Sequence, residues 1–148
     1  MKKVVIIYGS THHGNTYKLV KALSDRYQID IIDATKETKK DIASYDLVGF
    51  ASGIDFGRFY SSVEKFLENN LPGNKQVFFI YTCAKVDAKF TKSITEKALA
   101  KNATVLGEYG CKGYNTYGPL KLIGGMNKNH PDKMEIEDAF TFYESIAK

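Results

Sequence analysis

The chain has 148 residues and a mass of 16.6 kDa, which suits a single domain of ordinary size. Hydrophobic residues make up 43% of the chain and charged residues 26%, and no apolar run approaches the ~20 residues of a membrane span. The composition therefore predicts a soluble globular protein. A net charge of +4 permits an acidic or anionic partner without identifying one.

Five apolar runs rich in Val, Ile, Phe and Tyr alternate with helical patterns along the chain. The runs predict strands at Val4–Tyr8, Ile29–Ile32, Leu47–Ala51, Val77–Tyr81 and Val105–Tyr109. Apolar residues at helical spacing predict helices around residues 19–27, 63–67, 94–98 and 136–146. The lysine-rich stretch 36–41 is predicted to be a solvated helix face. The alternation favours a doubly wound α/β fold, a parallel sheet with helices on both faces.

The ligand site of such a sheet lies outside the carboxyl ends of its strands. The segments expected there are residues 9–15, 33–38, 52–59, 82–90 and 110–131. The last includes a long loop that is over-long for a plain connection, which favours a functional role. Tyr114 and Tyr117 in this loop are candidate lids over a ligand, although core packing is the more ordinary role for each.

The loop after the first strand, "GSTHHGNT" at residues 9–16, has the features of an anion site. It joins a strand to a helix start, where backbone amides and the helix dipole converge. Asn15 stands where a P-loop needs Lys, and the dinucleotide pattern GxGxxG is absent. The loop therefore suits a single phosphomonoester bound by neutral donors. The alternative is a plain hydroxyl-rich turn that caps the helix.

Residues "YGSTHHGNT" resemble the FMN phosphate loop of flavodoxins, although the loop is one residue longer than usual. The stretch "DLVGFASGIDFGRFYSSVEKFL" is similar to the second flavin loop of that family and the helix after it. The resemblance covers essentially the whole chain. It implies a flavodoxin-like domain over residues 1–148 with five parallel strands in the order 2-1-3-4-5, which is the known strand order of flavodoxins. It also implies FMN as the cofactor.

The ring of the flavin needs flat apolar contacts and a few backbone hydrogen bonds. Ile54 and Phe56 are candidate ring contacts, and Gly53 and Gly57 would let a peptide turn over at little steric cost. In the family such a flip lets a carbonyl accept a hydrogen bond from the reduced flavin. The alternative places Phe56 and Phe59 in the core. The full set of predicted cofactor-binding residues is Ser10, Thr11, His12, His13, Gly14, Asn15, Thr16, Gly53, Ile54, Asp55, Phe56, Gly57, Thr82, Cys83, Ala84 and Lys85.

The cysteines, histidines and N-terminus add few constraints. Cys83 and Cys111 are 28 residues apart without a CxxC pattern, so we predict reduced thiols and neither a disulfide framework nor a zinc site. No metal site is predicted from the adjacent His12 and His13, for which His130 is only a distant companion. The five-residue apolar run before Gly9 is too short for a signal-peptide core, which favours a cytoplasmic location.

The leading functional hypothesis is an FMN protein that carries electrons between a reductase and an acceptor enzyme, without a catalytic acid, base or nucleophile. The alternative is an FMN-dependent NAD(P)H or quinone-type reductase. A receiver domain would need acidic residues where Gly9, Ser10, Ala51 and Ser52 stand, and no nucleic-acid-binding pattern is visible.

The predicted ligand edge is basic, which favours partner proteins with acidic docking faces and a raised potential for the second electron. Its cations are Arg58, Lys85, Lys89, Lys92, Lys112, Lys121, Lys128 and Lys133, against Asp55, Asp87 and Asp132.

Overall fold

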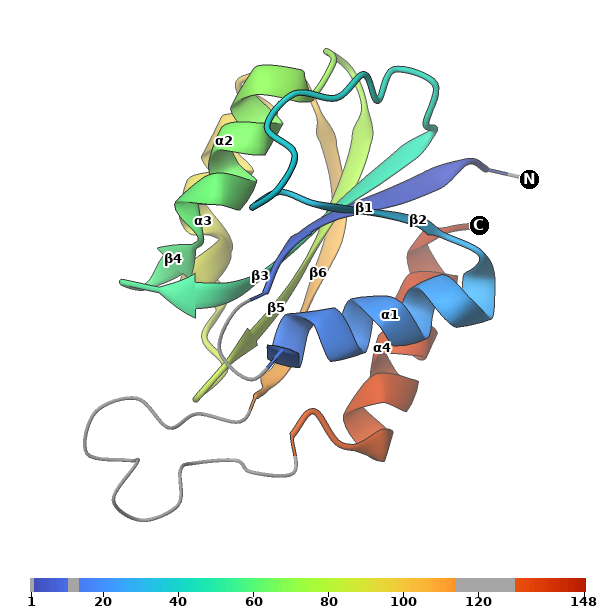
Figure 1. Ribbon diagram of the computed structural model, residues 1–148, viewed down its shortest axis with the longest axis vertical. Coiled ribbons are helices and arrows are strands. Elements are labelled where there is room, and N and C mark those ends of the chain that lie inside the picture. Colours follow the sequence, from blue (N-terminus) through green and yellow to red (C-terminus); the bar gives the residue numbers. More distant parts are fainter. Residues whose placement is uncertain (1, 11–13, 114–129) are drawn as a thin grey trace.

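The computed structural model describes residues 2–10, 14–113 and 130–148 (Figure 1). Its sheet is built from five parallel strands in the order β2-β1-β3-β5-β6, so the predicted order is confirmed. A short strand, β4, pairs antiparallel with the end of β3 and was not predicted. The strands are β1 (Val4–Gly9), β2 (Asp30–Asp33), β3 (Leu47–Asp55), β4 (Arg58–Phe59), β5 (Gln76–Cys83) and β6 (Thr104–Lys112).

Helices cover both faces of the sheet, as predicted: α1 and α4 lie on one face, and α2 and α3 on the other (Figure 1). The four helices are α1 (Asn15–Tyr27), α2 (Ser61–Asn70), α3 (Lys92–Leu99) and α4 (Lys133–Ile146). A short 3-10 turn, Ala88–Thr91, precedes α3. No helix of the described residues is long and apolar enough to cross a bilayer.

Two apolar cores hold these layers together, one on each face of the sheet. On the first face α1 buries Leu19, Val20 and Leu23 against β1 and β3. On the second face α2 buries Val63, Phe66 and Leu67, again at helical spacing. Each such side chain contributes about 1.5–3 kcal/mol when it is fully buried. The strands between them are buried on both sides, which explains their unbroken apolar runs.

The predicted helix face at residues 36–41 is wrong. The segment follows a turn in which the Asp33 carboxylate accepts from the amide of Thr35 at 2.9 Å, and its side chains are exposed. It has no apolar stripe to hold a helix on the sheet, since Ile42 is the next buried residue.

The strand register brings the predicted site segments to one edge. Gly9 at the end of β1 lies beside Ser52 of β3, and Gly53 lies beside Thr82 of β5. Thr82 and Cys83 in turn pair with Cys111 and Lys112 of β6. We call this row of carboxyl strand ends the carboxyl edge.

Candidate functional site

Helix α1 begins at the carboxyl edge directly after the predicted phosphate loop. Its N-cap residue, Gly14, has a left-handed backbone (φ 64°) and no side chain that can accept from the first turn. The first turn carries no acidic residue. The Ser10 hydroxyl accepts one amide, that of Tyr17, at 3.0 Å. The positive end of the α1 dipole is therefore not neutralised by a carboxylate of its own first turn. Thr11, His12 and His13, three of the predicted contacts, lie outside the described residues.

Two predicted contacts, Thr16 and Thr82, bind each other. Their hydroxyls are 2.8 Å apart, and both side chains are buried, with Thr16 only 1% exposed. The bond fastens the first turn of α1 to the end of β5. The Asn15 side chain lies over Gly113, where an added Cβ would come within 2.6 Å of its amide nitrogen. Thr16 therefore positions the helix start, and its hydroxyl faces the protein interior.

The second predicted loop is a two-residue hairpin between β3 and β4, in which Asp55 pairs with Arg58. Both turn residues, Phe56 (φ 53°) and Gly57 (φ 77°), have positive φ, as the hairpin-favouring type I′ turn requires. A left-handed Phe costs about 1–2 kcal/mol, and Phe56 is 95% exposed. The alternative of a core residue is thus wrong for Phe56 and confirmed for Phe59, which is 1% exposed. The turn therefore presents the Phe56 ring to solvent at the carboxyl edge.

Among the other hairpin residues, Gly53 is buried and Asp55 is exposed, while Ile54 packs partly against the core on the α2 side. Ile54 therefore faces the protein interior more than the outside of the edge.

Tyr60 belongs to this edge and was not predicted from the sequence. It is the N-cap residue of α2, and its amide donates to the buried Ser52 hydroxyl at 2.9 Å. Its ring covers the ends of two strands, because a Cβ on Gly53 would come within 2.5 Å of the Tyr60 hydroxyl and one on Gly9 within 3.2 Å of the ring. The available signal for an aromatic lying across two neighbouring strands was a glycine near the carboxyl end of each, Gly9 and Gly53.

The third predicted segment, residues 82–85, runs from buried Thr82 to exposed Lys85. Cys83 and Ala84 are half-buried between them, and burial raises the pKa of the Cys83 thiol to about 11. Cys83 packs against the core on the α2 and α3 side, whereas Cys111 lies in the core on the α1 and α4 side. Although their strands are neighbours, the two cysteines are free thiols on opposite faces of the sheet.

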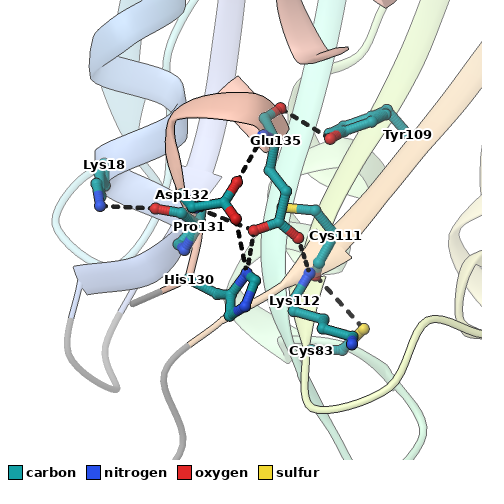
Figure 2. Close-up of polar contacts among 9 residues, drawn as sticks. All are labelled: Lys18, Cys83, Tyr109, Cys111, Lys112, His130, Pro131, Asp132 and Glu135. Carbon is teal, nitrogen blue, oxygen red and sulfur yellow. Dashed lines mark hydrogen bonds and ion pairs between the residues drawn. The ribbon is translucent and has the colours of Figure 1, made fainter. Parts of the chain in front are cut away.

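Helix α4 begins beside this segment with a dense polar cluster (Figure 2). Asp132 and Glu135 form a capping box with 2.9 Å bonds in both directions. The second Glu135 oxygen accepts from the amide of Lys112 at 3.2 Å, and His130 Nδ1 contacts the first. His130, Asp132 and Glu135 are close enough together to share an ion, but their carboxylates are already bound to backbone amides. The D-x-x-E spacing of residues 132–135 could have predicted this capping box from the sequence.

The structure shortens the list of free cations at the carboxyl edge. Arg58 pairs with Glu64, and Lys89 lies 3.5 Å from Asp87. Lys121 and Lys128 lie outside the described residues. Lys85, Lys92, Lys112 and Lys133 are exposed there without a salt bridge within the described part of the chain. The edge is basic, but less strongly than the sequence count suggests.

Comparison with known proteins places the chain in a family. The sequence pattern of the flavodoxin domain matches residues 5–118. An uncharacterized protein of Methanocaldococcus jannaschii is 42% identical over 148 residues, covering 99% of both chains. Rubredoxin:oxygen oxidoreductase of the anaerobe Desulfovibrio gigas shares the fold with a TM-score of 0.74 at 16% identity. The match covers 99% of this chain and 35% of that one, so the chain spans about a third of that protein's length.

A flavoprotein of Lactobacillus acidophilus NCFM, solved in complex with FMN, has the same fold with a TM-score of 0.58 and 16% identity. That match covers 74% of this chain and 93% of the flavoprotein. The structural likenesses show the fold, and the sequence match over most of the chain shows the family. The chain belongs to the flavodoxin domain family.

Proposed function

We propose that residues 1–148 form one FMN-binding domain that carries electrons between a reductase and an acceptor enzyme. The observation that carries the proposal is the start of α1, which has a glycine at its N-cap, no acidic residue in its first turn, and a place at the carboxyl edge. A helix start of this kind binds a phosphate monoester. In the proposed complex residues 10–16 hold the phosphate.

The flavin ring would lie between the hairpin residues 53–57 and residues 82–85. The register supports this, because Gly53 and Thr82 are neighbours across β3 and β5. Phe56 supplies an exposed aromatic face, and Tyr60 fills the floor between the hairpin and the phosphate loop. FMN would supply the one- and two-electron chemistry. The chain's own residues would bind the cofactor, orient it and exclude water from one of its faces.

The electron-carrier role is supported by the outer surface of the same edge. Phe56 and Val86 are exposed apolar residues there, 95% and 47% accessible, and the same edge carries exposed lysines without a salt bridge in the described part of the chain, among them Lys85 next to Val86. Such a surface suits a transient complex with a protein whose docking face is acidic. Complex formation would then slow as the salt concentration rises.

The test uses the purified chain after incubation with FMN and removal of the excess. We expect about one FMN per chain, reduction by dithionite, and rapid re-oxidation by a protein acceptor such as cytochrome c. NADH and NADPH alone should be consumed no faster than by free FMN. Steady NAD(P)H oxidation with a quinone acceptor would favour the reductase alternative instead, and a chain that takes up no FMN would contradict both.

A further inference from the structure

Glu64 is a buried carboxylate in the first turn of α2, and only 2% of its surface is exposed. One of its oxygens accepts from Arg58 of β4 and, at 3.2 Å, from the Ser93 hydroxyl of α3. The other oxygen is buried and has no hydrogen-bond partner among the described residues. A buried carboxylate with an unsatisfied oxygen costs free energy, which makes Glu64 a candidate for a role beyond stability.

Arg58 connects Glu64 to the hairpin at the carboxyl edge. Its backbone pairs with Asp55 across the turn, so it directly follows the strained Phe56 and the glycine after it. The Arg58 side chain is half exposed and is anchored at its tip by Glu64. Ser93 fixes the same carboxylate from α3, so Glu64 ties β4, α2 and α3 together at one point.

We propose that Glu64 is a positioning residue for the flavin site: through Arg58 it holds the β3–β4 hairpin in the conformation that presents Phe56. That the hairpin contacts a flavin rests on the proposed function. That Glu64 holds the hairpin in place does not. A left-handed Phe with an exposed side chain is not held by packing of its own ring. The two-residue turn is therefore fixed from its β4 side, where Arg58 provides the polar anchor.

The experiment uses the full chain with Phe56→Trp as a reporter, because the protein contains no other tryptophan. Glu64→Gln and Glu64→Met are introduced into this background. The matched control is Glu68→Gln, which removes a half-exposed carboxylate of the same helix paired with Lys97 at 3.1 Å. We expect the Glu64 variants to lower the fluorescence anisotropy of the introduced tryptophan in the flavin-free protein, and the control to leave it unchanged.

The same variants, now with Phe56 unchanged, are titrated with flavin to test whether the hairpin contributes to flavin binding. A less ordered hairpin should weaken FMN and riboflavin equally, about tenfold, since it contacts the ring they share. The melting temperature of Glu64→Met should change little, because the variant also removes the buried oxygen that has no partner among the described residues, and the half-exposed Arg58 left behind stays hydrated. Arg58→Gln, a change at a half-exposed residue, should reproduce the loss if a Glu64 variant fails to fold.

Equal anisotropy in the Glu64→Gln and Glu68→Gln proteins would overturn the proposal. So would a loss confined to FMN, which would place the effect at the phosphate, or an anisotropy change without any change in riboflavin affinity. If the wild-type chain bound no flavin, the proposed function would fail, while the anisotropy would still report whether Glu64 orders the hairpin.

Discussion

Helices α1 and α4 both begin at the carboxyl edge on the same face of the sheet, but their first turns are completed differently (Figure 1). The start of α4 is closed by Asp132 and Glu135, whose carboxylates accept the backbone amides there. The start of α1 has Gly14 at the N-cap and no acidic residue in its first turn. A helix start that the chain fills with its own carboxylates serves stability, and one that it leaves without them is available to an outside anion.

The strongest way to break this comparison is to give α1 a carboxylate like that of α4. Asp adopts the left-handed backbone at less cost than most residues, and a Cβ added at Gly14 would meet no atom of the described residues within 4 Å. Unit charges about 5 Å apart at an effective dielectric near 20 interact by roughly 3 kcal/mol. We therefore expect FMN to bind about a hundredfold more weakly, with riboflavin nearly unchanged, in fluorescence titrations. Gly14→Asn, similar in size but neutral, is the control. Equal effects of the two substitutions would show that charge is not responsible.

The converse change removes a capping carboxylate from the start of α4. Glu135→Gln weakens charge-assisted bonds to the amides of Asp132 and Lys112, which should cost about 1–3 kcal/mol of unfolding free energy in urea titrations. FMN affinity should change far less. Glu137→Gln, at an exposed position of the same helix, should leave stability within about 0.5 kcal/mol. A large loss of FMN binding in Glu135→Gln would mean that α4 takes part in the phosphate site.

A pH measurement examines Cys83, which lies between the two helix starts: its carbonyl accepts from Gly113, which touches Asn15. Folding raises the pKa of Cys83 from 9.0 to about 11. The neutral thiol is thus favoured in the folded state, so its contribution is complete below pH 9 and is lost as pH rises from 9 to 11. Two pKa units correspond to about 2.7 kcal/mol, and the partial exposure of the thiol reduces this value, so Cys83→Ala should remove about 1–2 kcal/mol of the fall in stability over that window. Identical pH slopes for the two proteins would contradict this.

The smallest expected effect concerns the lysines that surround the edge. In the FMN-loaded protein, Lys85→Gln should lower the potential of the second one-electron reduction by about 20 mV, because it removes one exposed and solvent-screened positive charge from the edge that would hold the reduced, more anionic flavin. Lys65→Gln on the exposed side of α2 is the control. A potential that does not respond to Lys85 would mean that this lysine points away from the cofactor.

Much of this architecture was predictable, because strands buried on both faces and amphipathic helices leave regular apolar patterns. The strands predicted at Val4–Tyr8 and Leu47–Ala51 match β1 and the first part of β3 in the structure. The candidate site was less predictable from the sequence, since its key features depend on contacts between residues that are distant along the chain. Nothing near Thr16 in sequence indicates that its hydroxyl binds Thr82, or near Glu64 that it anchors Arg58.

The hairpin shows the same limit in a local form. Gly53 and Gly57 were predicted to let a peptide flip, but nothing in the sequence indicated the pairing of β4 or the left-handed conformation of Phe56 itself. Residues 36–41 fail for the opposite reason, because charge alone was taken for a helix face where no apolar stripe supports one.

The most direct test of the central claim is titration of the flavin-free protein with FMN, riboflavin and FAD, followed by quenching of flavin fluorescence. The account predicts one FMN per chain and an affinity for FMN at least about a hundredfold above that for riboflavin, because a charged phosphate at the α1 start is worth about 3 kcal/mol. FAD should bind more weakly than FMN. Equal affinities for FMN and riboflavin, or no binding of either, would contradict a phosphate site at residues 10–16.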